Sequence, residues 1–144
     1  MKPFILLVII LFNGCTGTKP MNIGIKEGKL TQCPKTPNCV CSEYDQNDAE
    51  HYIQPIVYSS ELETARVKLK SIIESLERTK IIKEESDYIY SEFTSKIMRF
   101  VDDVEFRFDD SNKQIHIRSA SRIGRKDFGV NRKRIENIRS LFLK

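Results

Sequence analysis

The sequence lacks any hydrophobic run long enough to cross a bilayer. Its longest apolar stretch, residues 4–12, has nine residues, whereas a transmembrane helix needs about 20. Tryptophan is absent, and the 144 residues include only two histidines and four cysteines. The cysteines do not form the paired C-x2-C pattern that is common in zinc sites. The sequence therefore argues against a permanent transmembrane span, and it gives weak support for a metal centre.

The short apolar run has the layout of an export signal. Lys2 precedes it and Asn13-Gly14-Cys15 follows it, so a charged residue, an apolar region and a small residue before a cysteine occur in order. This pattern resembles a lipobox, with residues 1–14 as the signal peptide and Cys15 as the acylated residue. The alternative is an ordinary secretory signal with an incidental cysteine. We expect acyl chains such as palmitate to hold the protein on a membrane of the cell envelope, facing the periplasm or the exterior.

The remaining length and composition fit one globular domain. The chain is 40% hydrophobic and 31% charged, and 144 residues suffice for a single core. Residues 15–31 contain several glycines and one proline among polar residues, with few periodic apolar positions. We therefore predict a tether over residues 15–31 and a single domain over residues 32–144.

Apolar spacing predicts two helices on either side of a group of strands. Ser60-x-x-Glu63 has the form of a capping box that opens a helix to about Arg78, and Asn131 can cap a final helix over residues 132–143. The strand candidates, joined by turns of hairpin length, are residues 80–84, 87–94, 97–109 and 114–121. The predicted fold class is α+β: a helix, a four-stranded antiparallel β-meander, and a C-terminal helix packed on the sheet.

An acidic strand followed by a basic segment is the strongest clue in the chain. From Met98 to Phe108 the even positions are apolar except for Asp102, so this carboxylate points inward among apolar side chains. A buried carboxylate needs cations or hydrogen-bond donors. The polar network expected from the strand and the following segment consists of Asp102, Asp103, Glu105, Arg118, Ser119, Ser121 and Arg122.

The hairpin register sharpens this expectation. Pairing Phe108 with Ile115 and Phe106 with Ile117 places Asp102 opposite Ser121. We expect Asp102 to accept hydrogen bonds from Ser121 or Ser119 and to pair with Arg118 or Arg122. Asp103 lies on the opposite face, where its removal costs little if that face is exposed.

Three further cysteines, Cys33, Cys39 and Cys41, lie in a proline-punctuated loop. An exported chain meets an oxidising compartment, so one bridge is expected. A bond between Cys39 and Cys41 would close a small, strained ring, which leaves Cys33 with Cys39 or Cys33 with Cys41. Zinc bound by the three thiolates and His51, and a catalytic cysteine with His51 as base, both rank below a disulfide. We expect no metal and no cofactor.

Two blocks carry a resemblance to a known family. Residues 102–106 followed by residues 118–134 resemble the signature of the domain of unknown function 1499 family, and residues 33–42 resemble its other block. Together the blocks frame nearly everything from Cys33 to the C-terminus. The resemblance implies a small bacterial or plastid envelope-associated domain of undefined activity, and it favours a Cys33–Cys39 bridge. It carries over no catalytic residue.

The formal charge of +4 conceals a basic C-terminal end. Residues 118–144 include nine lysines or arginines against two acids, Asp127 and Glu136. Near the start of the last helix, Arg125, Lys126 and Arg132 are candidates for binding an anion such as a phosphate or a uronic-acid sugar. We therefore predict a binding or accessory module of the envelope, with an anionic small molecule or an envelope protein as partner. Nucleic acid is a poor candidate, because an exported protein rarely meets it.

Two other functions fit the sequence less well. A hydrolase could use Asp102 or Asp103, with Ser119, Ser121 or His116 nearby, but adjacent strand residues point to opposite faces and cannot share a site. His116 alternates with two isoleucines, which predicts a surface position. The third reading is a purely structural assembly partner. We therefore assign no enzyme activity, and we favour a binding module over an enzyme.

Overall fold

The computed structural model describes residues 17–144. The predicted signal peptide, residues 1–14, and Cys15 lie outside the described residues. Within the described part, no helix has the length and apolar character that a membrane span requires.

The fold is α+β, and its centre is the antiparallel meander that the sequence predicts. The meander strands are β5 (Thr79–Glu84), β6 (Tyr88–Thr94), β7 (Val101–Asp109) and β8 (Gln114–Ser121). The sheet is larger than predicted, because β3 (Cys39–Cys41) and β4 (Ile56–Val57) both pair with β8. Strands of two or three residues are too short to show an alternating pattern, so the prediction of four strands was wrong in number.

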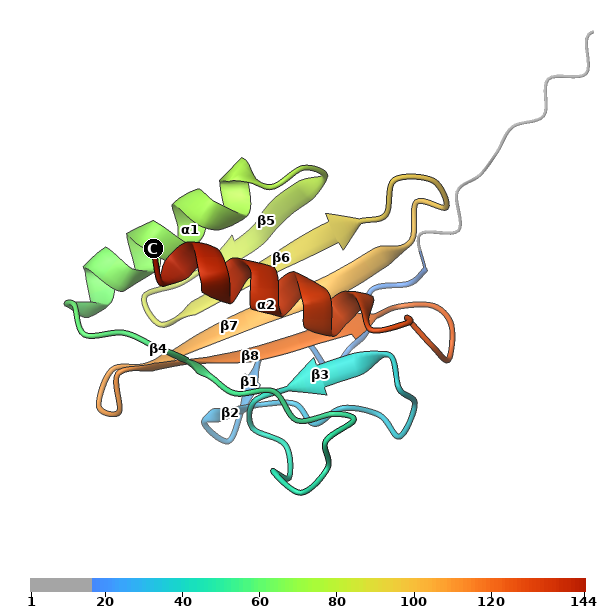
Figure 1. The fold of residues 1–144 in the computed structure, drawn as a ribbon, viewed down its shortest axis with the longest axis horizontal. Helices are drawn as coiled ribbons and strands as arrows, with labels where there is room; N and C mark the ends of the chain where they lie inside the picture. The colour runs from blue at the N-terminus through green and yellow to red at the C-terminus, as the bar shows by residue number, and fades with distance from the viewer. Residues whose placement is uncertain (1–16) are drawn as a thin grey trace, which may run out of the picture.

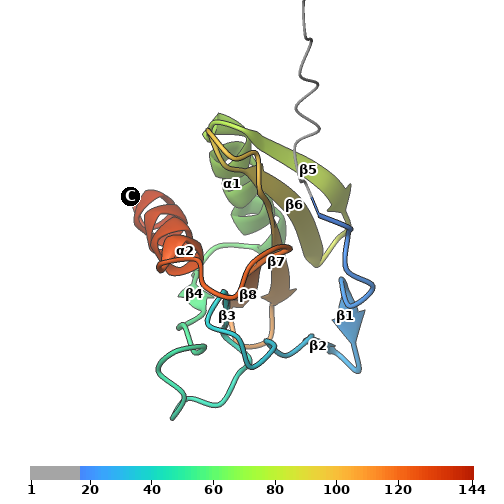
Figure 2. The same cartoon turned by 90° about the vertical axis from the view of Figure 1, so that its right-hand side faces the viewer.

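Two helices cover one face of this sheet (Figures 1 and 2). They are α1 (Leu62–Ser75) and α2 (Val130–Phe142). The main core lies between them and the sheet, where Phe106 of β7 packs with Leu69 of α1 and Ile138 of α2, all three fully buried. Burial of each such side chain contributes roughly 1.5–3 kcal/mol. The C-terminal helix therefore packs on the sheet as predicted.

Both helices begin differently from the sequence prediction. Ser60 does not cap α1, because its hydroxyl donates to the carbonyl oxygen of Glu61 (3.2 Å), and α1 ends at Ser75 rather than near Arg78. Asn131 does not cap α2 either, since the helix already starts at Val130. The carboxylate of Asp127 takes that role by accepting hydrogen bonds from the backbone N–H groups of Gly129 and Asn131, both at 2.9 Å. Asn131 is thus released for a buried position in the first turn.

The opposite face of the sheet is also covered, by the N-terminal part of the described chain (Figure 2). There β1 (Ile25–Lys26) and β2 (Lys29–Leu30) form a separate hairpin. Leu30 is 2% exposed and packs in a second core with Tyr88, Tyr90, Ala120 and cysteines of the disulfide loop. The described part of the predicted tether over residues 15–31 is therefore a packed layer. Its apolar residues alternate only over the short stretch from Met21 to Ile25, which is too brief a pattern to predict a packed layer.

Candidate functional site

The register of β7 and β8 agrees with the predicted hairpin. Asp102 lies opposite Ser121, Phe106 opposite Ile117, and Phe108 opposite Ile115. Even-numbered residues of β7 face the helices, and odd-numbered residues face the β1–β2 layer. Because both faces are covered, all residues from Val101 to Phe106 are buried. The predicted polar network is therefore split between two sides of the sheet.

On the helix side, Asp102 forms an ion pair with Arg134 of α2. The two side chains are 10% and 14% exposed. The prediction that Asp102 pairs with Arg118 or Arg122 is wrong, because Arg118 lies opposite Glu105 on β7 and shares its face, away from the helices. The predicted serine contacts are also absent, since Ser119 donates to Asn131 Oδ1 and Ser121 accepts from Asn131 Nδ2 (3.0 Å). Asn131 therefore joins α2 to the end of β8.

On the other side, Asp103 is 1% exposed, so its face is not open to solvent. Its carboxylate accepts from Arg122 Nη2 at 2.7 Å and from the hydroxyl of Tyr90 at 2.6 Å. The hydrogen bond to Asp103 is the main reason that the pKa of the Arg122 guanidinium is raised. Burial, followed by the hydrogen bond to Asp103, raises the pKa of Tyr90. Asp103 is thus a fully partnered structural acid.

Glu105 occupies the centre of the same side and is completely buried. It accepts from Arg118 Nη1 (3.1 Å), from the Tyr88 hydroxyl (2.7 Å) and from the backbone N–H of Gly24 (2.6 Å). The last contact ties the N-terminal layer to the sheet. Arg118 Nε is buried without a hydrogen-bond partner among residues 17–144. Three donors, one of them the Arg118 cation, satisfy the Glu105 carboxylate without any ligand.

A small cavity of about 280 Å³ lies beside this network and is lined by Asp103, Arg118, Arg122 and Cys33, among others. Both arginines that line it already face acids, since Arg118 pairs with Glu105, and Arg122 pairs with Asp103 and Glu92. An anionic ligand there would meet arginines whose positive charge is already balanced by these carboxylates. This cavity is therefore a weaker candidate for an anion than an open basic surface.

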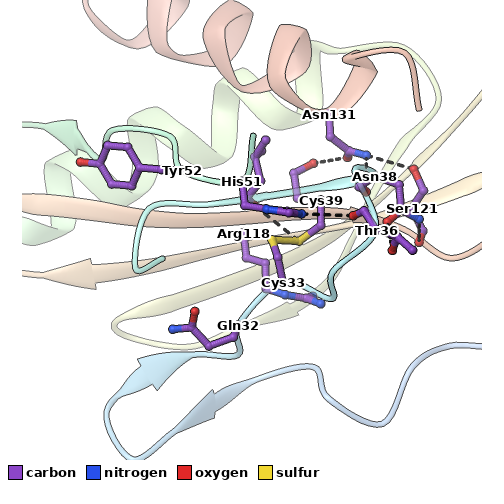
Figure 3. Close-up of a disulfide and its surroundings, with 12 residues drawn as sticks. Gln32, Cys33, Thr36, Asn38, Cys39, His51, Tyr52, Arg118, Ser121 and Asn131 are labelled. Carbon is purple, nitrogen blue, oxygen red and sulfur yellow. Dashed lines mark hydrogen bonds between the residues drawn. A yellow bond between two sulfur atoms is a disulfide. The ribbon is translucent and has the colours of Figure 1, made fainter. Parts of the chain in front are cut away.

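Cys33 and Cys39 are joined by a disulfide, with their Cα atoms 5.6 Å apart (Figure 3). The loop that it closes contacts the segment between β8 and α2 through Asn38, whose Nδ2 donates to the carbonyl oxygen of Gly124 (2.7 Å). Asn131 Nδ2 in turn donates to the Asn38 carbonyl (3.2 Å). The disulfide loop thus supports the segment between β8 and α2.

Cys41 is free and completely buried, and burial raises its pKa to about 11. The ring nitrogens of His51 contact the Asp48 carboxylate (2.8 Å) and the Thr36 carbonyl oxygen (3.3 Å). These contacts hold the ring in a structural role. Within residues 17–144, no three His, Cys, Asp or Glu side chains gather in a geometry that could hold a metal ion.

A second cavity of about 280 Å³ opens at the start of α2, and we call it the basic pocket. Its lining residues include Lys126, Phe128 and Arg132, together with the acids Glu50 and Asp127. Arg132 is already engaged, because its Nη2 donates to the carbonyl oxygens of Ala49, Glu50 and Tyr52 at 2.8 to 3.1 Å. Lys126 and the neighbouring Arg125 form no ion pair or side-chain hydrogen bond within residues 17–144, and both are exposed. The three predicted anion-binding residues thus divide into one structural and two free cations.

Phe128 is a feature that the sequence analysis missed. Its side chain is 88% exposed, and its backbone φ of 54° lies in the left-handed region, which is unfavourable for a bulky residue. The surrounding loop therefore holds an aromatic ring in solvent beside two unpaired cations. The aspartate and glycine of Asp127-Phe128-Gly129 predict a turn at this point of the chain. Hydrophobic periodicity, however, cannot predict the direction of a single side chain in a loop.

The fold and the site define a class of protein: a disulfide-tied α+β domain whose sheet is covered on both faces. It has a buried arginine–carboxylate network and an exposed basic loop. Residues 29–142 match the family described as "protein of unknown function (DUF1499)", and the chain belongs to this family. The resemblance drawn from the sequence blocks is thereby confirmed. No curated protein and no solved structure matches the chain.

Proposed function

We propose that the protein is an exported lipoprotein, anchored through Cys15, whose domain binds an anionic ligand at the basic pocket as a binding or accessory module of the cell envelope. The observation that carries the proposal is the pairing of two free cations with one exposed ring, since Lys126 and Phe128 both line the pocket and Arg125 lies beside them. Unpaired basic side chains attract anions over a Debye length of about 8 Å at physiological salt.

The alternative hydrolase has less support from the geometry. Asp102 and Asp103 lie on opposite faces of β7, and each is held by an arginine. Both candidate serine hydroxyls contact Asn131. His116 Nδ1 lies 3.2 Å from Ser42 Oγ, and burial is the main cause that lowers its pKa. A general acid or base needs access to a substrate proton, so these committed groups favour binding over catalysis.

The anchor is tested by the intact mass of the protein after expression in a bacterial host. We expect a chain that begins at Cys15 and carries acyl chains. Cleavage at another residue, or an unmodified Cys15, contradicts the lipoprotein part of the proposal.

The anion site is tested by titrating inorganic phosphate and glucuronate while amide NMR shifts are followed. We expect saturable shifts in residues 124–132 that disappear in the double variant Arg125→Ala and Lys126→Ala. The matched control is Lys26→Ala with Lys29→Ala, two exposed lysines on the β1–β2 hairpin. Equal weakening by both double variants would mean nonspecific charge attraction and would contradict a site.

A further inference from the structure

One end of the sheet gathers exposed apolar side chains from two loops. The β6–β7 turn (residues 95–100) and the β8–α2 loop (residues 122–129) leave the sheet together, because Thr94 pairs with Val101 and the backbone N–H of Arg122 donates to the Val101 carbonyl (3.1 Å). Figure 1 shows both loops at the same end of the molecule. Ile97, Met98 and Phe128 on these loops are 85%, 60% and 88% exposed. Three large apolar side chains exposed on two loops at one end of the sheet are candidates for an interaction surface.

The same two loops carry four exposed cations, Lys96, Arg99, Arg125 and Lys126. None of the four forms an ion pair or side-chain hydrogen bond within residues 17–144. The one carboxylate on the β8–α2 loop, Asp127, is used by the backbone N–H groups of α2. The two loops therefore expose apolar side chains together with positive charges that no neighbouring carboxylate of the described chain balances.

The described chain also starts at this end. Gly17 packs so closely against the β8–α2 loop that a Cβ atom on it would lie 2.9 Å from atoms of both Arg122 and Ile123. Cys15 stands two residues earlier in the sequence, and two residues span at most about 7 Å. An acyl anchor on Cys15 would therefore hold this end of the sheet, and not the β7–β8 hairpin end, near the lipid headgroups.

We infer that the tips of these two loops, which we call the membrane-facing end, lie on the bilayer and bind anionic phospholipid headgroups. Ile97, Met98 and Phe128 enter the interfacial region, and the four cations contact lipid phosphates. This inference rests on the proposed lipid anchor and deepens the proposed anion site, because it assigns the anion at Lys126 to a lipid. Apolar insertion combined with basic side chains is the usual composition of a surface that binds anionic membranes.

The absence of tryptophan makes a direct test available. The mature, acylated protein carrying Phe128→Trp is reconstituted into vesicles of phosphatidylcholine and phosphatidylglycerol whose acyl chains are brominated. We expect a blue shift and quenching of the indole at position 128. The matched control is Val57→Trp, which is 59% exposed but pairs with Gln114 at the opposite end of the sheet, and its indole should keep the emission of a solvated group.

The intact mass separates failure of the anchor from failure of the docking surface. Acyl chains on Cys15 with equally solvated indoles at positions 128 and 57 would overturn the inference and leave the lipoprotein proposal standing. If Cys15 is unmodified, vesicles are added to the soluble protein. Quenching at position 128 then supports the membrane-facing end without an anchor, and no quenching overturns it.

Charge reversal identifies the source of the anion. In phosphatidylglycerol vesicles, Arg125→Glu with Lys126→Glu should remove most of the quenching at position 128, whereas Lys26→Glu with Lys29→Glu should not change it. Vesicles of phosphatidylcholine alone should give a smaller effect. Saturable binding of inorganic phosphate at the basic pocket, with no lipid quenching, would overturn the lipid assignment and retain a soluble anion as ligand.

Discussion

Glu105 and Arg118 lie directly opposite each other on β7 and β8, and Glu105 Oε2 lies 3.1 Å from Arg118 Nη1 in an ion pair. The Glu105 side chain is 0% exposed and the Arg118 side chain 3% exposed. The pair lies between the sheet and the N-terminal layer, where Tyr88 and Gly24 also donate to the same carboxylate. Removal of water from two charges is costly, so a pair in this position stabilises the fold only while all its partners are present.

Replacement of Glu105 by Ala should therefore be strongly destabilising. It leaves the Arg118 charge buried and removes the acceptor for Tyr88, and we expect a loss of about 3–5 kcal/mol in the free energy of unfolding, measured by urea denaturation. The control is Glu85→Ala, whose partner Lys83 is 57% exposed and whose removal should cost at most about 1 kcal/mol. Similar small losses in both variants would mean that the Glu105 pair is hydrated.

Asp103→Ala should cost about 3 kcal/mol, in contrast to the small effect that an exposed face would give. The reason is that Arg122 and Tyr90 both donate to this carboxylate, and its side chain is 1% exposed. A double-mutant cycle with Arg122→Ala should show a coupling of about 1–3 kcal/mol. Additive effects of the two substitutions would contradict the ion pair.

Cys41 should resist alkylation in the native protein. With a pKa raised to about 11 by burial, only about one thiol in a thousand is ionised at pH 8, and the thiolate is the reactive form. Iodoacetamide followed by mass spectrometry should show no adduct at Cys41 in the native protein and one adduct at Cys41 in urea without reductant. Rapid labelling of the native chain at Cys41 would show that β3 opens readily.

Asp109 should make the turn after β7 sensitive to acid. Hydrogen bonds from Ser111 and Asn112 lower its pKa from 3.8 to about 2. The folded state therefore binds the proton less well than the unfolded chain, so its contribution to stability is fully present above about pH 4 and is lost as the pH falls through about 2. Carbon NMR of the carboxyl group checks the pKa, and Ser111→Ala should move it back toward 3.8. An unchanged pKa in this variant would contradict the assigned cause.

The register of the central hairpin could be predicted because its apolar residues alternate. Phe106 and Phe108 on one strand and Ile117 and Ile115 on the next share one face in this pairing. The short turn between the strands selects it over registers shifted by two residues, which would keep the same face. The same alternation correctly turned Asp102 inward. The alternating apolar residues of these two strands, with the short turn between them, thus sufficed to predict the pairing at the centre of the sheet.

The cation that pairs with Asp102 could not be predicted in the same way. Arg118 is close in sequence but lies on the wrong face, while Arg134 reaches Asp102 only through the position of α2. Helix placement depends on packing of the whole core, and sequence spacing does not report it. The burial of Asp103 was missed for a related reason, since the layer on its side of the sheet comes from the N-terminal part of the described chain, where Gly24 bonds Glu105 across 81 positions.

The two-sided cover of the sheet has a consequence for how the chain folds as it emerges, N-terminus first, from a ribosome or a translocation pore. Gly24 can form its hydrogen bond with Glu105, and Asn38 with Gly124, only after these partners have been synthesised 81 or more residues later. Contacts so distant in sequence form slowly, and the helix layer cannot be completed until α2, the last element, has emerged. A chain stalled before β8 would lack both α2 and the strand that pairs with β3, β4 and β7, so its unfinished sheet would be exposed to aggregation and proteolysis.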